Sequence, residues 1–337
     1  MSDNKAIGMN EALRLRKEKE MRESYTIEDV QKTSVEVIIP TLNEELTIGG
    51  LIDRIRSLDV PVNTSILVID GGSTDGTIEV CKRKNVRLVT QRGRGKGKAM
   101  REAADETSAD IIVFIDADAT YPPEDMPLLL QPLLEHKADM VVGSRIASKR
   151  EKGAIQRFNV LGNKIFNKAI NFAMGSSVTD SLSGYRALHT KTFKELVLFS
   201  DSFEIEVEMT VEALARGLRI SEVPIGYGVR TGAPTKLDPF RDGIKIARSL
   251  LFILMNVTPL KFFGLIFLGF IVVGFYPAYF VLHEKITVGE ITSIPAVVLS
   301  SLLFVTGAIA LVVGILSELV VRSRRRLEYL ISKKLDS

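Results

Sequence analysis

Two aspartates separated by one residue, Asp116 and Asp118, are the clearest chemical signal in the sequence. They follow Ile111–Ile115, an apolar run with the composition of a buried strand. Alternate residues leaving a strand point to the same side, so both carboxylates can face one hard cation such as Mg²⁺ or Mn²⁺. A cation held there would bind a diphosphate through its remaining positions. The competing interpretation is a pair of solvated turn acids ahead of Pro122 and Pro123.

A second signal is the stretch Arg92–Lys98, in which basic residues alternate with glycines. Glycine lets the backbone approach a phosphate, while Arg94 and Lys96 supply positive charge. The stretch is not a Walker A loop, because no Gly stands five residues before Gly97 and an Ala follows Lys98. A P-loop nucleotide hydrolase is therefore disfavoured. A dehydrogenase is disfavoured as well, since no G-x-G-x-x-G fingerprint follows the first expected strand.

These residues need a scaffold, and residues 34–238 supply one by alternating strand and helix patterns. Apolar β-branched runs separated by helices indicate an α/β fold with a mostly parallel sheet covered on both faces. Ligands of such sheets bind at the carboxyl ends of the strands, where the polar segments lie in this sequence. The expected strands are Val35–Ile39, Thr64–Ile69, Val86–Val89 and Ile111–Ile115, and the expected helices are Thr47–Leu58, Thr77–Lys84 and Lys98–Glu106.

The C-terminal third is much more apolar, and it accounts for a mean hydropathy of +0.16 in a chain with 25% charged residues. Apart from Lys261 near its start, Leu260–Leu282 carries no charge, and neither does Ile294–Ser317; each is long enough to cross a bilayer. The positive-inside rule places the Arg322–Arg326 cluster and the globular part in the cytoplasm. Two buried core helices are the alternative. Pro239–Leu254 reads as an interfacial helix, or equally as an amphipathic helix packed on the globular part.

The overall composition excludes several classes of protein and site. The net charge of +3 over 337 residues does not indicate a nucleic-acid binder. A single cysteine, Cys81, excludes an intramolecular disulfide and a cysteine-rich zinc site. Three histidines make histidine-based metal sites and catalytic triads poor hypotheses.

Taken in order, Pro40–Glu44, Asp70–Thr77 and Asp116–Asp118 resemble the GT-A glycosyltransferases of family 2. More narrowly, they resemble the polyprenyl-phosphate (dolichyl-phosphate) hexose synthases. The resemblance implies a Rossmann-like GT-A catalytic domain followed by an interfacial helix and a two-helix transmembrane hairpin. The expected parts are a charged arm (1–33), the catalytic domain (34–238), the interfacial helix (239–258), the hairpin (259–321) and a basic cytoplasmic tail (322–337).

The resemblance also implies roles for individual residues. Nucleotide-sugar binding is expected of Pro40, Asn43, Glu44, Asp70, Ser73, Arg94, Lys96, Asp116, Asp118, Glu208, Arg230 and Lys236. Lipid-phosphate binding is expected of Arg145, Arg157 and Ser183. Catalysis is expected of Asp118, Glu206, Arg230 and Lys236, and metal binding of Asp116 and Asp118. Arg157 could equally be a surface residue, and Glu206 and Glu208 a solvated helix face. Thr120 stands where many members have a Gln ligand, which leaves the third metal ligand open.

The reaction implied is an inverting, Mg²⁺- or Mn²⁺-dependent transfer of a hexose from a nucleotide sugar to dolichyl or polyprenyl phosphate. The stretch Arg94–Gly97 favours UDP-glucose or UDP-N-acetylglucosamine, because GDP-mannose enzymes of the family tend to be less basic there. The alternatives are a GDP-mannose-dependent mannose synthase, a processive polysaccharide synthase and a non-catalytic membrane scaffold. The expected partners are the two substrates and the membrane, with no nucleic acid and with a homo-oligomer left open.

Overall fold

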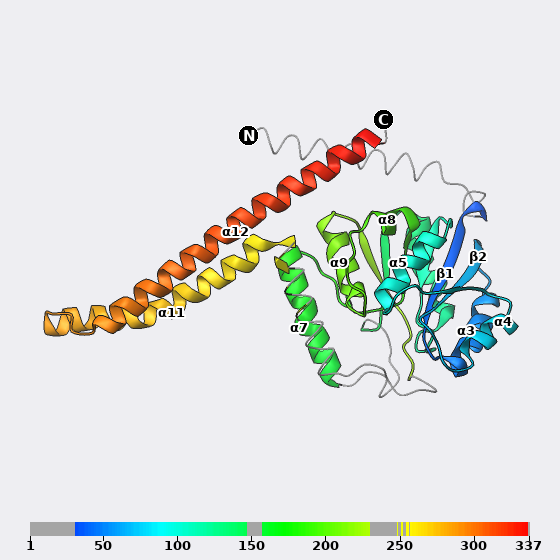
Figure 1. The fold of residues 1–337 in the computed structure, drawn as a ribbon, viewed down its shortest axis with the longest axis horizontal. Helices are drawn as coiled ribbons and strands as arrows, with labels where there is room; N and C mark the ends of the chain where they lie inside the picture. The colour runs from blue at the N-terminus through cyan, green and yellow to red at the C-terminus, as the bar shows by residue number, and fades with distance from the viewer. Residues whose placement is uncertain are drawn as a thin grey trace. The chain divides into compact units, whose positions relative to one another are not determined.

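A seven-stranded sheet forms the centre of the first of two units, residues 1–247 and 248–337 (Figure 1). This computed structural model describes residues 31–146, 157–229, 248, 251, 254–255 and 257–335. The strands are β1 (Ser34–Thr41), β2 (Asn63–Asp70), β3 (Arg87–Thr90), β4 (Ile111–Phe114), β5 (Met140–Ser144), β6 (Arg186–His189) and β7 (Ile220–Pro224). The helices are α3 (Glu45–Arg56), α4 (Thr77–Arg83), α5 (Lys96–Glu106), the short 3₁₀ helix η1 (Pro123–Asp125), α6 (Met126–Leu134), α7 (Arg157–Met174), α8 (Thr190–Glu195) and α9 (Ile205–Ala215).

The strand order is β3-β2-β1-β4-β6-β5-β7, and β6 alone among these strands runs antiparallel to its neighbours. The pairs β1–β2, β2–β3, β1–β4 and β5–β7 are parallel, which confirms the predicted mostly parallel sheet. The register pairs Thr41 with Asp70 and Ile38 with Phe114. The segments that leave β1, β2 and β4 therefore emerge at one edge of the sheet, as the sequence predicted.

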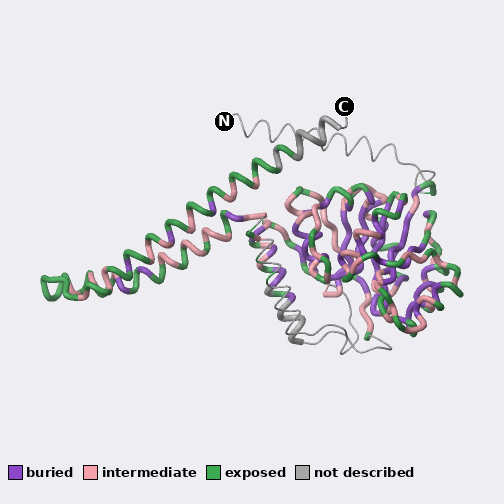
Figure 2. Tube along the Cα trace, viewed as in Figure 1, coloured by how far each residue is buried: buried purple, intermediate pink, exposed green. Residues whose placement is uncertain are grey.

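Each face of the sheet is buried under its own layer of helices, and the strands appear as the buried interior in Figure 2. Val37 and Ile39 of β1 join the core under α3, α4 and α6. Ile38, which points to the opposite face, joins the core under α5, α8 and α9. Burial on both faces explains why Ile66–Ile69 of β2 and Ile111–Phe114 of β4 are apolar at consecutive positions rather than at every second one.

The expected elements agree with the structure within about two residues, and the start of α5 is the informative difference. The helix begins at Lys96, so Lys96 lies in its first turn rather than in the preceding loop. Gly95 is its N-cap and has a φ of 97°, a conformation that favours glycine. A side chain at Gly95 would also overlap the carbonyl oxygen of Asp201. Glycine is thus required here both by conformation and by space.

The second unit consists mainly of α11 (Pro259–Val288) and α12 (Ile294–Leu335), which pack against each other. Both are long and apolar enough to cross a membrane, over Pro259–Val288 and Ile294–Arg324. Their surfaces are largely exposed within the chain, as Figure 2 shows, which argues against two buried core helices. Glycine allows close packing between them, because a Cβ on Gly274 would lie 2.8 Å from the Phe304 ring.

Of three further predicted parts, the structure describes the basic segment but leaves out most of the interfacial helix and of the charged arm. The basic segment from residue 322 is helical as far as Leu335, where it continues α12. Most of the predicted interfacial helix, residues 239–258, lies outside the described residues, and so do residues 1–30 of the charged arm. Both of these stay predictions.

Candidate active site

The segments that follow β1 and β2 are joined by hydrogen bonds between predicted site residues. The buried Asp70 carboxylate accepts bonds from the backbone N–H of Gly72 and Ser73 and from the Ser73 hydroxyl. That same hydroxyl accepts the Asn43 N–H at 2.8 Å, and Asn43 Oδ1 accepts the Thr74 N–H at 2.8 Å. Asn43 has a φ of 50°, which Asn adopts more readily than most residues. These hydrogen bonds fix the two segments to each other and keep their polar side chains at the carboxyl ends of β1 and β2.

Three more predicted residues lie along this part of the rim. Pro40 is near the end of β1, and Glu44 is buried with its backbone N–H donating to Thr77 Oγ1 at 2.9 Å. Arg94 is exposed in the glycine-rich loop. Each lies near the carboxyl end of a strand, where the sequence predicted a ligand site.

Lys96, Asp116 and Glu206 form what we call the Lys96 cluster. The Lys96 ammonium lies 2.5 Å from Asp116 Oδ1 and 2.7 Å from Glu206 Oε1. Burial by itself would lower the pKa of Lys96, but the two carboxylates raise it above its ordinary value, so Lys96 carries its charge. Among the described residues no partner reaches the buried Glu206 Oε2. A Cβ on Gly184 would lie 2.8 Å from Lys96 Nζ and 2.9 Å from Asp116 Oδ2, so the missing side chain leaves room for the pair.

Asp118 lies two residues beyond Asp116 and is oriented by Thr120. Asp118 Oδ1 accepts the Thr120 hydroxyl at 2.6 Å and the Thr120 N–H at 3.1 Å. Ala119 between them has a φ of 58°, which costs a residue with a side chain on the order of 1 kcal/mol and is typical of functional sites. The position that the resemblance left open as a metal ligand therefore holds a residue that fixes the neighbouring carboxylate.

The two aspartates fit a divalent cation as part of its coordination shell. Carboxylate oxygens are the donors that Mg²⁺ and Mn²⁺ prefer. Among the described residues no group of three or more His, Cys, Asp and Glu could complete the shell. A cation on Asp116 and Asp118 would therefore depend on water and on a bound diphosphate for its other ligands.

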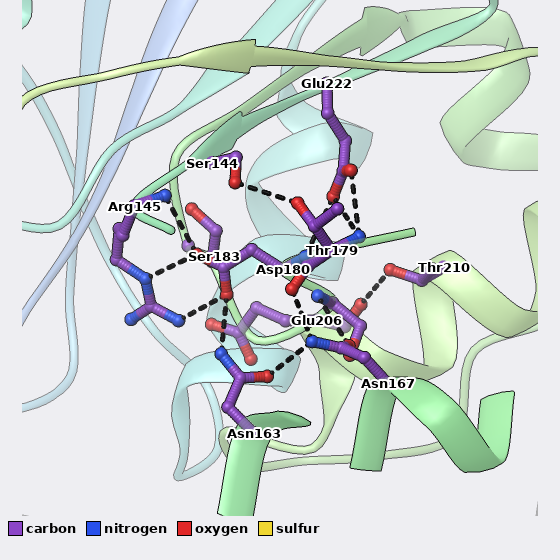
Figure 3. A network of polar contacts seen from close by, with 12 residues as sticks. Ser144, Arg145, Asn163, Asn167, Thr179, Asp180, Ser183, Glu206, Thr210 and Glu222 are labelled. Carbon is purple, nitrogen blue, oxygen red and sulfur yellow. Dashed lines mark hydrogen bonds and ion pairs between the residues drawn. The ribbon is translucent and has the colours of Figure 1, made fainter. Parts of the chain in front are cut away.

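Arg145, Asp180 and Asn163 form a second group, the Arg145 cluster (Figure 3). Arg145 donates through its backbone N–H and Nε to Asp180 Oδ2, both at 2.9 Å, and through Nη2 to Oδ1 at 2.7 Å. Asn163 Nδ2 donates to Oδ1 at 3.0 Å. Burial by itself would raise the pKa of Asp180, but the guanidinium and these hydrogen bonds hold it below its ordinary value. The guanidinium also lies 5.4 Å from the centre of the Tyr227 ring.

A fully buried arginine, Arg186, holds the segment between the two clusters. Its Nε donates to the Ser183 carbonyl at 2.7 Å, its Nη2 to the Ser181 carbonyl, and its Nη1 to Thr210 Oγ1 at 2.8 Å. Burial lowers the pKa of Arg186 to about 10, which still leaves it charged at neutral pH. The Ser183 hydroxyl is buried, and no hydrogen-bond partner reaches it among the described residues. Figure 3 shows Ser183 and Glu206 together beside Arg145.

Glu208 has a different environment from its helical neighbour Glu206. Its carboxylate accepts the backbone N–H groups of Phe199 and Ser200 at 3.0 and 2.8 Å. The next residue, Asp201, accepts the Gly97 N–H at 2.9 Å, so Glu208 braces a loop that lies on the start of α5. Its predicted contact with the nucleotide sugar stays a prediction.

Three predicted residues cannot be placed, and two unpredicted ones take part in the site. Arg230 and Lys236 lie outside the described residues, and the Arg157 side chain is not among those described. The Tyr121 hydroxyl accepts the Gly184 N–H at 3.0 Å. Asn167 binds the Asp180 segment from α7. The four-residue spacing of asparagines in α7 was a visible signal, whereas nothing in the sequence singled out Tyr121.

Comparison with known proteins gives consistent matches. The profile of glycosyl transferase family 2 matches residues 36–197. Glycosyltransferase AglJ of Haloferax volcanii is 38% identical over 292 residues, which cover 86% of this chain and 94% of AglJ. The dolichyl-phosphate hexose transferase of the same organism is 33% identical over 229 residues, which cover 67% of this chain and 94% of that protein.

A search of solved structures also finds a sugar-transferring enzyme. Glucosyl-3-phosphoglycerate synthase from Mycobacterium tuberculosis, in complex with Mn²⁺, UDP-glucose and phosphoglyceric acid, matches with a TM-score of 0.57 at 28% identity. The match covers 68% of this chain and 84% of that chain. It confirms the fold class predicted from the sequence.

Proposed function

The chain belongs to glycosyl transferase family 2, and from that premise we propose that it transfers a hexose from a nucleotide sugar to the phosphate of dolichyl or another polyprenyl phosphate. The observation that carries the proposal is the pairing of two charged clusters on one rim. The Lys96 cluster offers carboxylates and an ammonium, and the Arg145 cluster offers a fixed guanidinium. The segment of residues 180–186 joins them. A transferase of this kind needs one site for a leaving diphosphate and another for an incoming phosphate.

At the donor end, charge develops on the diphosphate as the anomeric bond breaks. A Mg²⁺ or Mn²⁺ ion bound by Asp116 and Asp118 would supply a Lewis acid for that charge. Lys96 lies against Asp116 and adds a positive charge in a largely buried position, where electrostatic stabilisation is stronger than in water. Thr120 holds the Asp118 carboxylate in one orientation. Arg230 and Lys236 are proposed to bind the same diphosphate.

At the acceptor end, the nucleophile is a phosphate oxygen that is already anionic at neutral pH. It needs no general base, so the task of the protein is to position it and to exclude water. Asp180 engages Nε and Nη2 of Arg145, and among the described residues no hydrogen bond involves Nη1. This outer nitrogen can bind the acceptor phosphate. Direct attack on the anomeric carbon would invert its configuration.

The donor we favour is UDP-glucose or UDP-N-acetylglucosamine. Support comes from the basic stretch Arg94–Gly97 and from the solved relative, which holds UDP-glucose with Mn²⁺. The buried Glu206 Oε2, with no partner among the described residues, is an acceptor for a sugar hydroxyl. GDP-mannose is the alternative that the same experiment distinguishes.

The second unit supports a membrane location. The helices α11 and α12 are long and apolar enough to span a bilayer, and a polyprenyl phosphate exposes its phosphate at the bilayer surface. We propose that both helices span the membrane and that the catalytic unit lies on the cytoplasmic side, since the Arg322–Arg326 cluster follows the second span.

The test is a donor panel with the purified full-length chain, dolichyl phosphate and Mg²⁺ or Mn²⁺. We expect a lipid-extractable, mild-acid-labile product from a UDP-hexose. No such product from UDP-glucose, UDP-N-acetylglucosamine or GDP-mannose would contradict the proposal. Asp118→Ala should abolish the product, while Asp59→Ala, a substitution of an exposed aspartate away from the rim, should not. Full activity of Asp118→Ala with metal present would refute the metal assignment alone.

A further inference from the structure

Three asparagines lie one helical turn apart along α7, at positions 163, 167 and 171. Residues four apart share one face of a helix, and this face binds the segment 176–181. Asn163 and Asn167 are buried, although asparagine is mostly a surface residue. Buried amides at this spacing indicate a built polar connection, because each would otherwise carry the cost of unpaired polar atoms.

Hydrogen bonding gives the buried amides a single orientation. Asn167 Oδ1 accepts the backbone N–H and the hydroxyl of Ser181, so its Nδ2 must face the other way. That Nδ2 donates to Asn163 Oδ1 at 2.8 Å and to the Thr179 carbonyl. Asn163 therefore presents its own Nδ2 to Asp180. The chain of donors and acceptors admits no flip of either amide without leaving a buried group unpaired.

The chain of bonds ends on the oxygen that holds the Arg145 guanidinium. Asp180 Oδ1 accepts both Asn163 Nδ2 at 3.0 Å and Arg145 Nη2 at 2.7 Å (Figure 3). On the other side, Glu222 accepts the backbone N–H groups of Thr179 and Asp180. The Asp180 backbone is thus fixed by a strand, and its carboxylate is fixed by a helix.

We propose that Asn163 is a positioning residue for the acceptor phosphate, which it serves by fixing the Asp180 carboxylate that aims Arg145. The inference rests on the proposed function, in which Arg145 binds that phosphate. Without the Asn163 donor, the carboxylate can turn about its own bond, and the guanidinium turns with it. The outer nitrogen of Arg145 then meets the phosphate in many orientations instead of one, which weakens acceptor binding and leaves donor binding unchanged.

The test compares Asn163→Ala with Asn171→Ala in the full-length chain. Asn171 bonds to Ser176 and to the Val178 backbone but not to Asp180, so its loss removes local bonds of the same kind. We expect Asn163→Ala to raise the KM for dolichyl phosphate about tenfold, the effect of one charge-assisted hydrogen bond. The donor KM and kcat should change less than about threefold, and Asn171→Ala should leave both KM values near wild type.

A second readout separates this inference from the proposed function. Dolichyl phosphate should raise the melting temperature of the wild-type chain more than dolichol does, and Asn163→Ala should lose that difference. The wild type could make no lipid product and still be stabilised more by dolichyl phosphate than by dolichol, with Asn163→Ala losing this difference. Sugar transfer would then be refuted, and the inference about Asn163 would stand. An unchanged acceptor KM with an unchanged difference overturns the inference, and so does a wild type that does not distinguish the two lipids. If Asn163→Ala does not fold, Asn163→Leu, which is close to asparagine in volume and has no group that can donate, is expected to give the same loss.

Discussion

The Lys96 cluster and the Arg145 cluster both pair carboxylates with a cation, but the hydrogen-bonding capacity of those carboxylates is filled to different extents. Asp180 accepts four hydrogen bonds on its two oxygens, and one positive charge faces one negative charge. In the Lys96 cluster one ammonium faces two carboxylates, and Glu206 Oε2 has no partner among the described residues. Asp118, two residues beyond Asp116 in the sequence, carries a further negative charge.

This difference indicates two kinds of site. A saturated pair keeps its geometry when a ligand arrives, which suits the positioning of a nucleophile. A cluster with excess negative charge and an unpaired oxygen has room for a cation and for a sugar hydroxyl, and its bonds rearrange when they bind. We infer that the Lys96 cluster is completed by its substrates, whereas the Arg145 cluster is complete before they bind. The predictions below test that difference.

Replacement of Lys96 should have the largest effect. Lys96→Met keeps much of the side-chain volume and removes the charge, so the buried Glu206 carboxylate and the partly exposed Asp116 carboxylate lose the cation between them. We expect transfer to fall about 1000-fold and the free energy of unfolding to fall by about 3–5 kcal/mol, the range for a broken buried ion pair. Lys82→Met, in an exposed position on α4, is the control for both measurements. More than a tenth of wild-type activity in Lys96→Met would show that the cluster does not need its cation.

Replacement of Asp180 should affect stability as strongly and should do so in a pH-dependent way. Asp180→Asn removes the charge that pairs with Arg145, at a cost of about 3–5 kcal/mol at neutral pH. The native pKa of Asp180 is lowered, so its contribution is present above the unfolded pKa of about 3.9 and is lost as the pH falls through the native value. Chemical unfolding of both chains from pH 7 downwards should show their stabilities converge below about pH 4. A constant difference would mean that the pair is not what stabilises the segment.

These two clusters also mark how far the sequence could predict the site. Asp116 and Asp118 were predictable because strand ends in a parallel sheet meet at one edge, and two acids after a strand point to one side. The ion pair between Lys96 and Glu206 could not be predicted, because it depends on how α9 packs against the sheet. Glu206 lies 110 residues after Lys96 in the chain. Glu208 shows the same limit, since the residue type alone does not reveal that it braces a loop.

The fold was more predictable than the site for a related reason. Apolar β-branched runs such as residues 35–39 specify strands locally, so the expected boundaries agree with the structure. The Arg145 cluster depends instead on long-range contacts, from β5 to residue 180 and from α7 to the same carboxylate. The spacing of the asparagines in α7 was visible in advance, but its meaning depended on knowing what faces that side of the helix.

Replacement of Gly184 tests whether the Lys96 cluster needs its space. The added methyl of Gly184→Ala would lie within 3 Å of Lys96 Nζ and Asp116 Oδ2, and the flexible lysine can move away at little cost to stability. We expect activity to fall about 30-fold, the metal concentration for half-maximal activity to rise, and the melting temperature to change little. The control is Gly50→Ala on α3, where a Cβ has no neighbour within 4 Å. Its activity should equal that of the wild type, and its melting temperature should be equal or higher. Normal activity of Gly184→Ala would mean that the cluster tolerates displacement.

Replacement of Thr120 tests whether Asp118 must be oriented. Thr120→Val keeps the shape and removes the hydroxyl that donates to Asp118 Oδ1. We expect activity to fall about tenfold, with a matching rise in the activating metal concentration, as for other residues that orient a metal ligand. Thr120→Ser keeps the hydroxyl and should recover most of the activity. Equal loss in both variants would assign the effect to packing of the buried side chain instead.

Replacement of Ser183 should have the smallest effect, and it probes the boundary between the clusters. The Ser183 hydroxyl is buried with no partner among the described residues, so Ser183→Ala removes a desolvated group that stabilises nothing. The unfolding free energy should therefore stay constant or rise slightly. If the hydroxyl completes its bonding with the acceptor phosphate, the acceptor KM should rise about threefold while the donor KM stays constant; the reverse pattern would assign Ser183 to the sugar. A raised donor KM would mean that the unpaired polar groups bind only the sugar donor, as the contrast between the two clusters requires. A raised acceptor KM would mean that the acceptor side also contains a polar group that is paired only when its substrate binds.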